Sequence, residues 1–191
     1  MRWDELGEER CSIARTVSVI GDRWSLLILR DCFLRVRRFE EFEARLGITR
    51  HILADRLRKL VAEGVLKKVP YHERPARYEY RLTQKGLDLY PVLMSIVHWG
   101  DTYTAGRAGR PLLLQHMACG HQFDPVLTCS ECGEMVDPRR VRVMPGPGAG
   151  RKQRQFLAEQ DRRDMSNAEL DKSATPTASS QGSPGRRRSA A

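Results

Sequence analysis

The chain has 191 residues, a formal net charge of +9 and a pI near 9.7. This length accommodates one domain of about 100–150 residues with appendages, and the basic balance favours nucleic acid or an anionic membrane surface as partner. The longest apolar run, around 26–29, is far below the roughly 20 residues of a membrane span, and the N-terminus MRWDELGEER is too acidic for a signal peptide. We therefore expect a cytoplasmic protein without membrane contact, whose cysteines are thiols, metal ligands or sensors rather than structural disulfides.

Two helices are predicted near the N-terminus. The first covers residues 11–20, because apolar side chains recur at helical spacing and a glycine follows, at Ile13, Val17, Ile20 and Gly21. Asp22 is a suitable N-cap for the second helix, residues 23–33, since its carboxylate accepts from unpaired backbone N–H groups. We expect the apolar side of this second helix to face the core, through Trp24, Leu27 and Ile28.

A helix-turn-helix is predicted over residues 39–64. The first helix, FEEFEARLG (39–47), is short and amphipathic, and its turn falls at Gly47. In the second, ITRHILADRLRKLVAEG (48–64), Thr49 can cap the start, Gly64 can end the helix, and one apolar stripe is formed by Leu53, Leu57, Leu60 and Val61. Basic and small residues occupy the opposite side, as in a DNA-recognition helix. The alternative is a helix hairpin whose charges are simply solvated.

A β-hairpin is predicted directly after the second helix. Residues 65–70 and 77–82 are β-prone, and two prolines bracket the loop between them, which limits pairing to a short hairpin with an irregular tip. A hairpin at this place is a wing, and its tip suits phosphate contact or minor-groove entry through His72, Arg74 and Arg77. Residues 35–85 carry fourteen Lys and Arg against seven Asp and Glu, a surplus of +7. The alternative is an ordinary solvated hairpin.

The next helix should begin at Thr83, its cap, and run from Gln84 to about Tyr103, with a kink or restart at Pro91. Its apolar residues surround more of the helix than docking on one domain requires: Leu89, Val92, Leu93, Ile96, Val97, Trp99 and Tyr103. Such a surface usually marks an interface, so we expect a homodimer formed by this helix and the first one. Two-fold symmetry would place two recognition helices in successive major grooves.

Several stretches together resemble one protein family. CSIARTVSVIGDRWSLLILRD, RFEEFEARLGITRHILADRLRKLVAEGVL, PYHERPARYEYRLTQKG and the closing LYPVL and WGDTY are similar to the HxlR-type winged-helix transcriptional regulators, relatives of the MarR group. The resemblance covers Cys11 to Gly106, in order and with the spacing intact. It implies a dimeric DNA-binding regulator, often a repressor of a neighbouring gene. It also implies that Cys11 matches the cysteine with which some members sense oxidants or electrophiles.

Cys11 lies at the start of the first predicted helix, where the helix dipole can lower the pKa of a thiol and make it more reactive. The functional interpretation is a redox switch that alters the dimer geometry when oxidised. The alternative is a small buried hydrophobe that packs in the dimer interface. Cys32, late in an apolar helix, is predicted to be a core residue.

Residues 109–145 differ in composition and contain Cys119, His121, Cys129 and Cys132. The two-residue spacing in CSECG, followed by glycine, suits one half of a tetrahedral zinc site. Cys119 with His121 or His116 would supply the other half, although a single residue between Cys119 and His121 is tighter than usual. Structural zinc, free or redox-active thiols and a disulfide, the last disfavoured in the cytosol, remain open. Four protein ligands would leave no open position for catalysis.

The predicted fold class is α+β, mainly α. Residues 1–108 form a winged helix-turn-helix with dimerising terminal helices, residues 109–145 a small zinc-ribbon-like module, and residues 146–191 a flexible, disordered tail. Within that tail, RKQRQFLAEQDRRDM can form a transient basic helix, and the Ser/Pro/Gly/Ala-rich end should be disordered.

These features favour a sequence-specific regulator of double-stranded DNA, a dimeric repressor with a redox or electrophile response, which requires no cofactor beyond a structural zinc ion. The candidates for base contacts are Thr49, Arg50, His51, Ala54 and Asp55, and those mainly for phosphates are Arg58, Lys59, Arg74 and Arg77. Arg56 can equally pair with a carboxylate. The alternative is a winged-helix protein-interaction adaptor without specific DNA readout. We expect no enzyme, because nucleophile–base pairs, phosphate loops and catalytic metal motifs are absent from the sequence. The sequence identifies no small-molecule effector.

Overall fold

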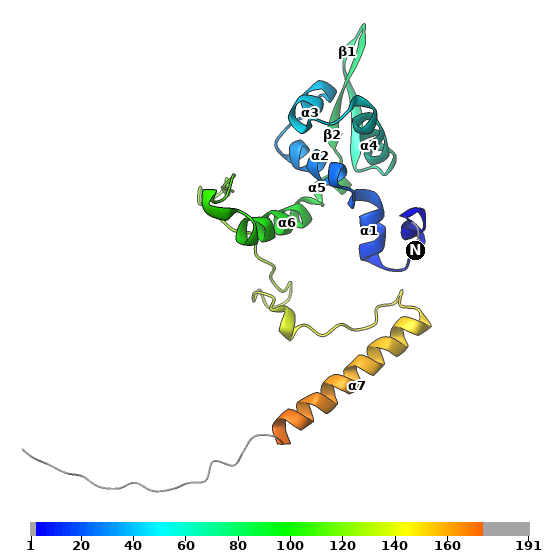
Figure 1. The fold of residues 1–191 in the computed structure, drawn as a ribbon, viewed down its shortest axis with the longest axis vertical. Helices are drawn as coiled ribbons and strands as arrows, with labels where there is room; N and C mark the ends of the chain where they lie inside the picture. Colours follow the sequence, from blue (N-terminus) through cyan, green and yellow to red (C-terminus); the bar gives the residue numbers. More distant parts are fainter. Residues whose placement is uncertain (1–2, 174–191) are drawn as a thin grey trace, which may run out of the picture. The chain divides into compact units, whose positions relative to one another are not determined.

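The first hundred residues fold into helices and one hairpin that follow the sequence patterns closely (Figure 1). The computed structural model describes residues 3–173. The chain divides into two units, Met1–Val141 and Arg142–Ala191, and the first contains both the predicted winged helix and the Cys/His-containing segment.

The two N-terminal helices begin and end close to their predicted bounds. After a short 3-10 helix, η1 (Trp3–Glu8), α1 spans Ser12–Ile20 and α2 spans Arg23–Phe33. Asp22 caps α2 as predicted, because its Oδ1 accepts from the backbone N–H groups of Trp24 at 3.1 Å and Ser25 at 3.0 Å. The buried Ser25 also donates its hydroxyl to Asp22 Oδ2 at 2.5 Å, which fixes the carboxylate at the corner between the two helices.

The predicted helix-turn-helix is formed by α3 (Phe39–Leu46) and α4 (Arg50–Ala62). Gly47 ends α3 with φ 59°, and Gly64 follows α4 with φ 69°, a left-handed backbone that glycine adopts without strain. Thr49 occupies the N-cap position of α4, but its side chain makes no capping hydrogen bond, contrary to our prediction. The start of α4 is exposed, so water or an anionic partner can satisfy its N–H groups.

A buried carboxylate joins α2 to α3. The side chain of Asp31 is fully buried, and it accepts from Arg30 Nε at 2.9 Å and from Arg45 Nε of α3 at 3.1 Å. Because both arginines remain about half exposed, their charges stay hydrated while the carboxylate is neutralised. This pair fixes the first helix of the helix-turn-helix against α2.

The apolar stripe of α4 forms the centre of one hydrophobic core. Its fully buried members, from α2, α3, α4 and the start of the hairpin, are Ile28, Leu29, Phe42, Leu53, Leu57, Leu60, Val65 and Leu66. Trp24 packs only at the edge of this core and is half-buried. Ile13, one of the apolar residues whose spacing predicts α1, is 75% exposed, because α1 reaches the core only through its last turn at Ile20.

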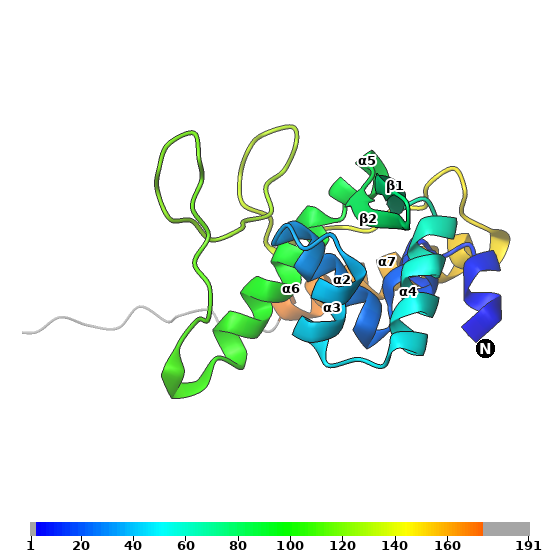
Figure 2. The same ribbon diagram turned by 90° about the horizontal axis from the view of Figure 1, so that it is seen from above.

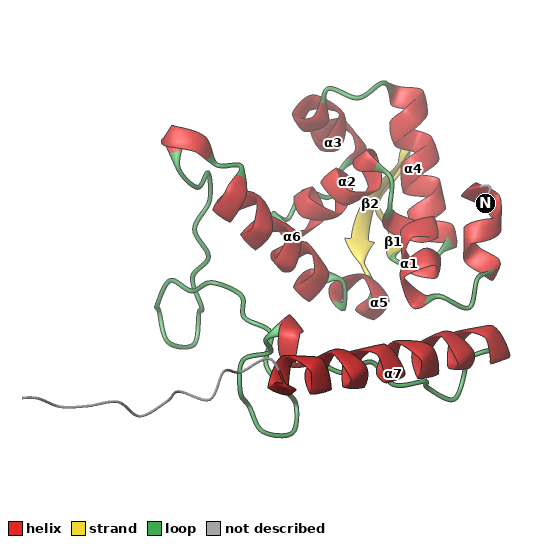
Figure 3. Ribbon diagram, turned by 60° about the horizontal axis from the view of Figure 1, so that its bottom comes forward, coloured by secondary structure: helices red, strands yellow, loops and turns green. Residues whose placement is uncertain are grey.

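The wing is an antiparallel hairpin of β1 (Leu66–Glu73) and β2 (Ala76–Leu82), drawn in yellow in Figure 3. It is longer than predicted and pairs up to Glu73 opposite Ala76. Pro70 is accommodated by a register irregularity between Pro70 and His72, so the missing N–H does not end the strand. The loop before α3 forms an isolated bridge with β2, between Arg38 and Glu79, and the N–H of Tyr80 donates to the carbonyl of Arg37 at 2.8 Å.

The next helical segment is divided into α5 (Gln84–Leu87) and α6 (Tyr90–Tyr103), with Pro91 in the first turn of α6, which confirms the predicted restart. Thr83 caps α5 as expected, its hydroxyl accepting from the N–H of Gly86 at 3.2 Å. Gly86 is buried against the hairpin, and a Cβ atom there would lie 2.3 Å from the carbonyl oxygen of Val65. Only glycine therefore allows α5 to pack this closely.

Residues 104–141 contain two 3-10 turns, η2 (Gly106–Ala108) and η3 (Pro138–Arg140), and isolated bridges. In the second unit, α7 spans Arg151–Ser173, where we predicted a basic helix within a flexible tail. The remainder of that predicted tail, residues 174–191, lies outside the described residues. None of the helices in residues 3–173 combines the length and apolarity needed to cross a membrane.

Candidate nucleic-acid interface

Most of the predicted DNA contacts lie on the outer face of α4 and at the wing tip, which projects past α3 and α4 in Figure 1. The α4 positions recur every three or four residues, so they share the side opposite the core stripe. The side chains that are exposed are those of Thr49, Arg50, His51, Arg58, Arg74 and Arg77, and those that are half-buried are Ala54, Asp55 and Lys59.

The first turn of α4 is positioned by contacts to α3. Arg50 Nη1 lies 2.5 Å from Glu43 Oε2, and its guanidinium stacks over the Phe39 ring at 4.9 Å. The Arg50 side chain is still 65% exposed, so these contacts orient the guanidinium without removing it from solvent. His51 beside it is exposed and free to present its ring outward.

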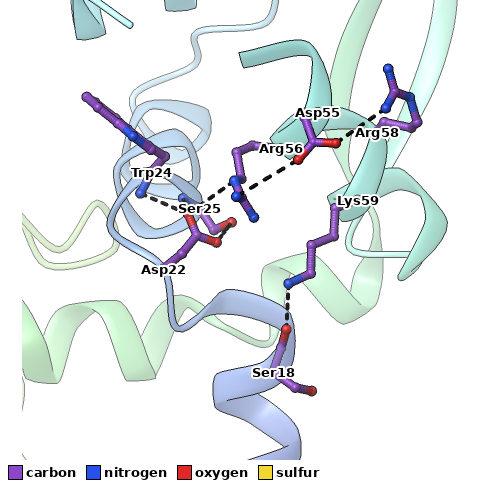
Figure 4. Close-up of polar contacts among 8 residues, drawn as sticks. All are labelled: Ser18, Asp22, Trp24, Ser25, Asp55, Arg56, Arg58 and Lys59. Carbon is purple, nitrogen blue, oxygen red and sulfur yellow. Dashed lines mark hydrogen bonds and ion pairs between the residues drawn. The ribbon is translucent and has the colours of Figure 1, made fainter. Parts of the chain in front are cut away.

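Farther along α4, a line of ion pairs runs from the outer face to the start of α2 (Figure 4). Arg58 Nη1 lies 3.4 Å from Asp55, and Arg56 lies 3.9 Å from Asp55 and 3.6 Å from Asp22. Arg56 is thus directed to neighbouring carboxylates, one of the two roles that we considered. Burial acts to raise the pKa of Asp22, but hydrogen bonds from Ser25, together with Arg56, lower that pKa below its ordinary value.

Lys59 lies apart from the other predicted contacts. Its Nζ donates to the carbonyl oxygen of Ser18, in the last turn of α1, at 2.6 Å (Figure 4). A cation near a helix C-terminus satisfies an unpaired carbonyl and interacts favourably with the helix dipole. The structure therefore gives Lys59 a role in joining α4 to α1, and we leave it out of the proposed interface.

The wing tip carries basic side chains that are exposed and unpaired within the described part of the chain. Arg74 and Arg77 are exposed, and neither forms an ion pair or a side-chain hydrogen bond with any residue that the structure describes. His72 shares the tip, with its Nδ1 3.0 Å from the carbonyl oxygen of Pro75. Two unpaired guanidinium groups on a projecting hairpin can bind phosphates or enter a minor groove.

Our sequence interpretation did not consider Lys67 and Lys68, although both are visible in the strand sequence. Lys67 lies directly opposite Arg81, and like charges in that position destabilise a strand pair. Lys68 sits over the Tyr78 ring at 4.0 Å, and Glu79 accepts from Arg81 at 2.9 Å. The cost of placing like charges opposite each other would be offset by a polyanion along this face of the wing.

The redox candidate and the dimer candidates lie on α1 and α6. Cys11 is an exposed free thiol at the N-cap of α1, and Ile13 follows it. On α6, Ile96 is 49%, Trp99 61% and Tyr103 73% exposed. Both helices therefore expose apolar side chains in the single chain. Cys32 packs against the core, as predicted, and burial with the neighbouring Asp31 charge raises its pKa to about 12.

The four metal candidates lie in two separate loops of the first unit. Cys119 Sγ is 3.4 Å from Nδ1 of His116, not of His121, and Cys129 is adjacent to Cys132. Backbone N–H groups of Cys132 and Glu131, with the Cys132 thiol, lower the pKa of Cys129. Among the described residues, no group of three or more His, Cys, Asp or Glu side chains is arranged to hold a metal ion. The structure thus groups the candidates as pairs.

Comparison with known proteins identifies close relatives. The profile of the HxlR-like helix-turn-helix family matches residues 19–108. The uncharacterized HTH-type transcriptional regulator Rv3095 of Mycobacterium tuberculosis is 45% identical over 137 residues, covering 72% of this chain and 87% of the relative. Because this match is longer than residues 1–108, the similarity extends beyond the winged helix.

Two solved structures are also similar. The crystal structure of PA1607, described as a candidate transcription factor, has a TM-score of 0.67 and 37% identity and covers 73% of this chain and 98% of that one. The structure of PA1374 from Pseudomonas aeruginosa, described in the same way, has a TM-score of 0.54 and 36% identity, covering 76% and 99%.

Proposed function

Because the chain belongs to the HxlR-like helix-turn-helix family of transcriptional regulators, we propose that it is a dimeric repressor that binds a two-fold symmetric operator in double-stranded DNA. It is a DNA-binding regulator and not an enzyme. The observation that carries the proposal is the exposed basic surface of α4 and the wing, with Arg50, Arg58, Arg74 and Arg77 all accessible. We place its activity in the cytoplasm, where its operator is.

The proposed division of roles follows from exposure and reach. The first turns of α4 enter a major groove and contact base edges, through Thr49, Arg50, His51, Ala54 and Asp55. Arg58 and the wing arginines Arg74 and Arg77 bind phosphates, and the wing tip follows the backbone toward a minor groove. Lys67 and Lys68 add positive charge along the strand that leads to that tip.

The proposed dimer uses the exposed apolar side chains of α1 and α6. The Trp99 and Tyr103 rings lie 5.5 Å apart between centroids, tilted by 48°, and both are exposed, as is Ile13 on α1. A second copy of the chain would bury this surface and supply the second recognition helix. A dimer that covers two successive major grooves at a promoter excludes RNA polymerase, which is why we propose repression.

A response to oxidants or electrophiles at Cys11 is a second part of the proposal. The thiol is exposed at the start of α1, and α1 is joined directly to α4 by the hydrogen bond from Lys59 to the carbonyl of Ser18. A change in α1 at the dimer interface would therefore alter the position of α4. Under this proposal, Cys11→Ser protein binds DNA normally and no longer responds to oxidant.

The experiment that tests the proposed function is fluorescence anisotropy with the duplex upstream of the chain's own gene, near physiological salt. A scrambled duplex of the same composition is the control, and both are measured with and without mild oxidant. Preference for the upstream duplex supports a regulator, and release by oxidant in wild type but not in Cys11→Ser supports the thiol switch. If genome-wide selection also yields no preferred sequence, the winged helix serves as a protein-interaction adaptor instead.

A further inference from the structure

The Cys/His-containing segment is an internal repeat of thirteen residues. The stretches LLQHMACGHQFDP (113–125) and VLTCSECGEMVDP (126–138) align without a gap. Leucine, cysteine, glycine, aspartate and proline recur at the same places: positions 114, 119, 120, 124 and 125 in the first copy, and 127, 132, 133, 137 and 138 in the second. In this alignment His116 corresponds to Cys129, whereas His121 corresponds to Glu134.

The two copies form two separate loops of the same conformation, and both loops appear in the yellow-green part of the chain in Figure 2. An isolated antiparallel bridge closes each loop at equivalent residues, Gln115 with Gln122 and Thr128 with Met135. In both copies a glycine follows the cysteine that recurs in the repeat, and this glycine has a left-handed backbone. Its φ is 72° in the first copy (Gly120) and 74° in the second (Gly133). Equivalent sequence has therefore produced equivalent backbone.

The hydrogen bonds inside the two loops match as well. The N–H of His116 donates to the carbonyl of His121 at 2.9 Å, and the N–H of Cys129 donates to that of Glu134 at 2.8 Å. The glycine N–H donates back to the carbonyl of His116 in the first copy, at 2.7 Å, and of Cys129 in the second, at 2.9 Å. His116 and Cys129 thus occupy the same position in the same turn.

Each loop brings two metal-binding side chains together. In the first, Nδ1 of His116 lies 3.4 Å from Sγ of Cys119. In the second, the Cys132 thiol and the backbone N–H groups of Cys132 and Glu131 donate to the Cys129 sulfur. The repeat thus places one pair of candidate ligands in each loop.

The apolar side chains of this segment do not form a core. Met117 is 88% exposed, Leu127 and Met135 are each 73% exposed, and Leu113 is 61% exposed. A segment of this size with ordered turns and little burial usually depends on a disulfide or a metal ion for stability. The matched loops, the paired ligands and the missing core have one common explanation.

We propose that residues 113–138 bind one zinc ion through His116 and Cys119 from the first loop and Cys129 and Cys132 from the second. Both pairs have the two-residue spacing of structural zinc sites, and three sulfurs with one nitrogen complete a tetrahedral set. Since the described residues present the ligands as separate pairs, the ion itself joins the two loops and provides the core that the segment lacks. Binding forms three zinc–sulfur bonds and one zinc–nitrogen bond, and it releases the three thiol protons to solvent.

The test is the zinc content of the full chain, purified without a histidine tag and measured by inductively coupled plasma mass spectrometry. We expect one zinc ion per chain in wild type, and loss of that zinc in Cys132→Ser and in His116→Gln. His121→Gln is the matched control and should retain one zinc per chain. Cobalt added to metal-free protein should give the absorption of a tetrahedral site with three thiolates, with a weaker sulfur-to-metal band in Cys132→Ser.

Three results would overturn the proposal. In the first, the purified chain contains no zinc and binds no stoichiometric zinc when zinc is added. The segment would then be a pair of loops with free thiols. Zinc that is lost in His121→Gln but kept in His116→Gln would show that the repeat does not define the ligands. Half an equivalent of zinc per chain would mean that two chains share one ion. None of these measurements depends on DNA binding, so they are independent of the proposed function.

Discussion

Single charged side chains position α4 against the rest of the domain. Asp22 both caps α2 and faces Arg56 of α4 at 3.6 Å, and Lys59 donates to the last turn of α1 at 2.6 Å. The sequence predicts Asp22 as a helix cap, whereas it presents Arg56 and Lys59 as charges on the outer side of an amphipathic helix. Which of them face DNA and which face a neighbouring helix depends on tertiary packing, and helical periodicity alone does not distinguish the two.

Replacing Asp22 with asparagine should destabilise the fold in a pH-dependent way. Because the folded state lowers the pKa of Asp22, its ionised form stabilises the protein above the ordinary aspartate pKa of about 3.9, and this stabilisation is lost as pH falls through the lowered pKa. Asparagine can still cap α2, so we expect a deficit of up to about 1 kcal/mol at neutral pH. The deficit should shrink in acid.

Urea unfolding of both proteins between neutral pH and pH 3 measures this difference. Asp22→Ala is the control, since it also loses the cap and should cost about 1 kcal/mol more than asparagine. A wild-type advantage over Asp22→Asn that stays constant across the whole range would show that ionisation of Asp22 contributes nothing.

At the scale of helices and strands, most of the fold could be predicted from the sequence. Three features depend on local sequence alone. Capping by Asp22 sets the start of α2, the proline ring at Pro91 sets the restart at α6, and glycines with a left-handed backbone end α3 and α4. The length of the wing could not be predicted, because the irregularity that accommodates Pro70 depends on the partner strand. The exposure of Ile13 could not be predicted, because helical periodicity marks an apolar face without saying what covers it.

The site shows the same division. The exposure of Arg74 and Arg77 follows from their place at the end of a hairpin. The contact of Lys59 with α1, in contrast, joins residues 41 positions apart and could not be predicted from local sequence. Pairing of His116 with Cys119 depends on the turn geometry that the thirteen-residue repeat encodes. The repeat itself is present in the sequence alone, where residues 113–125 align with residues 126–138.

Gly86→Ala should be strongly destabilising, since the new methyl group would meet the carbonyl oxygen of Val65 at 2.3 Å and α5 would have to move from the hairpin. Overpacking of a buried site costs about 1–3 kcal/mol. Gly100→Ala in α6 is a matched control, because its nearest contact would be an ordinary 3.7 Å to Thr104 and alanine is favoured in helices by about 1 kcal/mol. Thermal unfolding should separate the two variants, and an unchanged melting temperature for Gly86→Ala would contradict the packing of α5.

At the scale of the whole molecule, the first unit combines an exposed basic surface on α4 and the wing, an exposed apolar face and a Cys/His-containing segment. The winged helix has its own hydrophobic core, whereas α1 and α6 expose apolar side chains beyond what that core covers. Such exposure is unusual on a monomer and typical of an interface. Under the proposed function, reading two half-sites would depend on the association of two chains through this face.

Trp99→Glu should weaken the proposed dimer without unfolding the chain, because this side chain is 61% exposed in one copy. Loss of a central aromatic residue costs an interface about 2 kcal/mol or more, which is roughly a thirty-fold increase in the dimer dissociation constant. Leu34→Glu, at a 46% exposed leucine that ends α2 and belongs to neither α1 nor α6, is the control. Sedimentation velocity at graded concentrations measures the change. A dimer that Trp99→Glu leaves intact would place the interface elsewhere.

The central claim, that α4 reads bases while the wing binds phosphates, is tested most directly by the salt dependence of binding to an operator and to random duplex. Arg74→Ala should weaken binding to the operator and to random duplex by the same factor. It should also reduce the slope of log affinity against log salt concentration by about 1. His51→Ala should cost about 1–3 kcal/mol on the operator, with little effect on random duplex and an unchanged slope. Equal losses on both duplexes for both variants, with identical slopes, would contradict this division of roles.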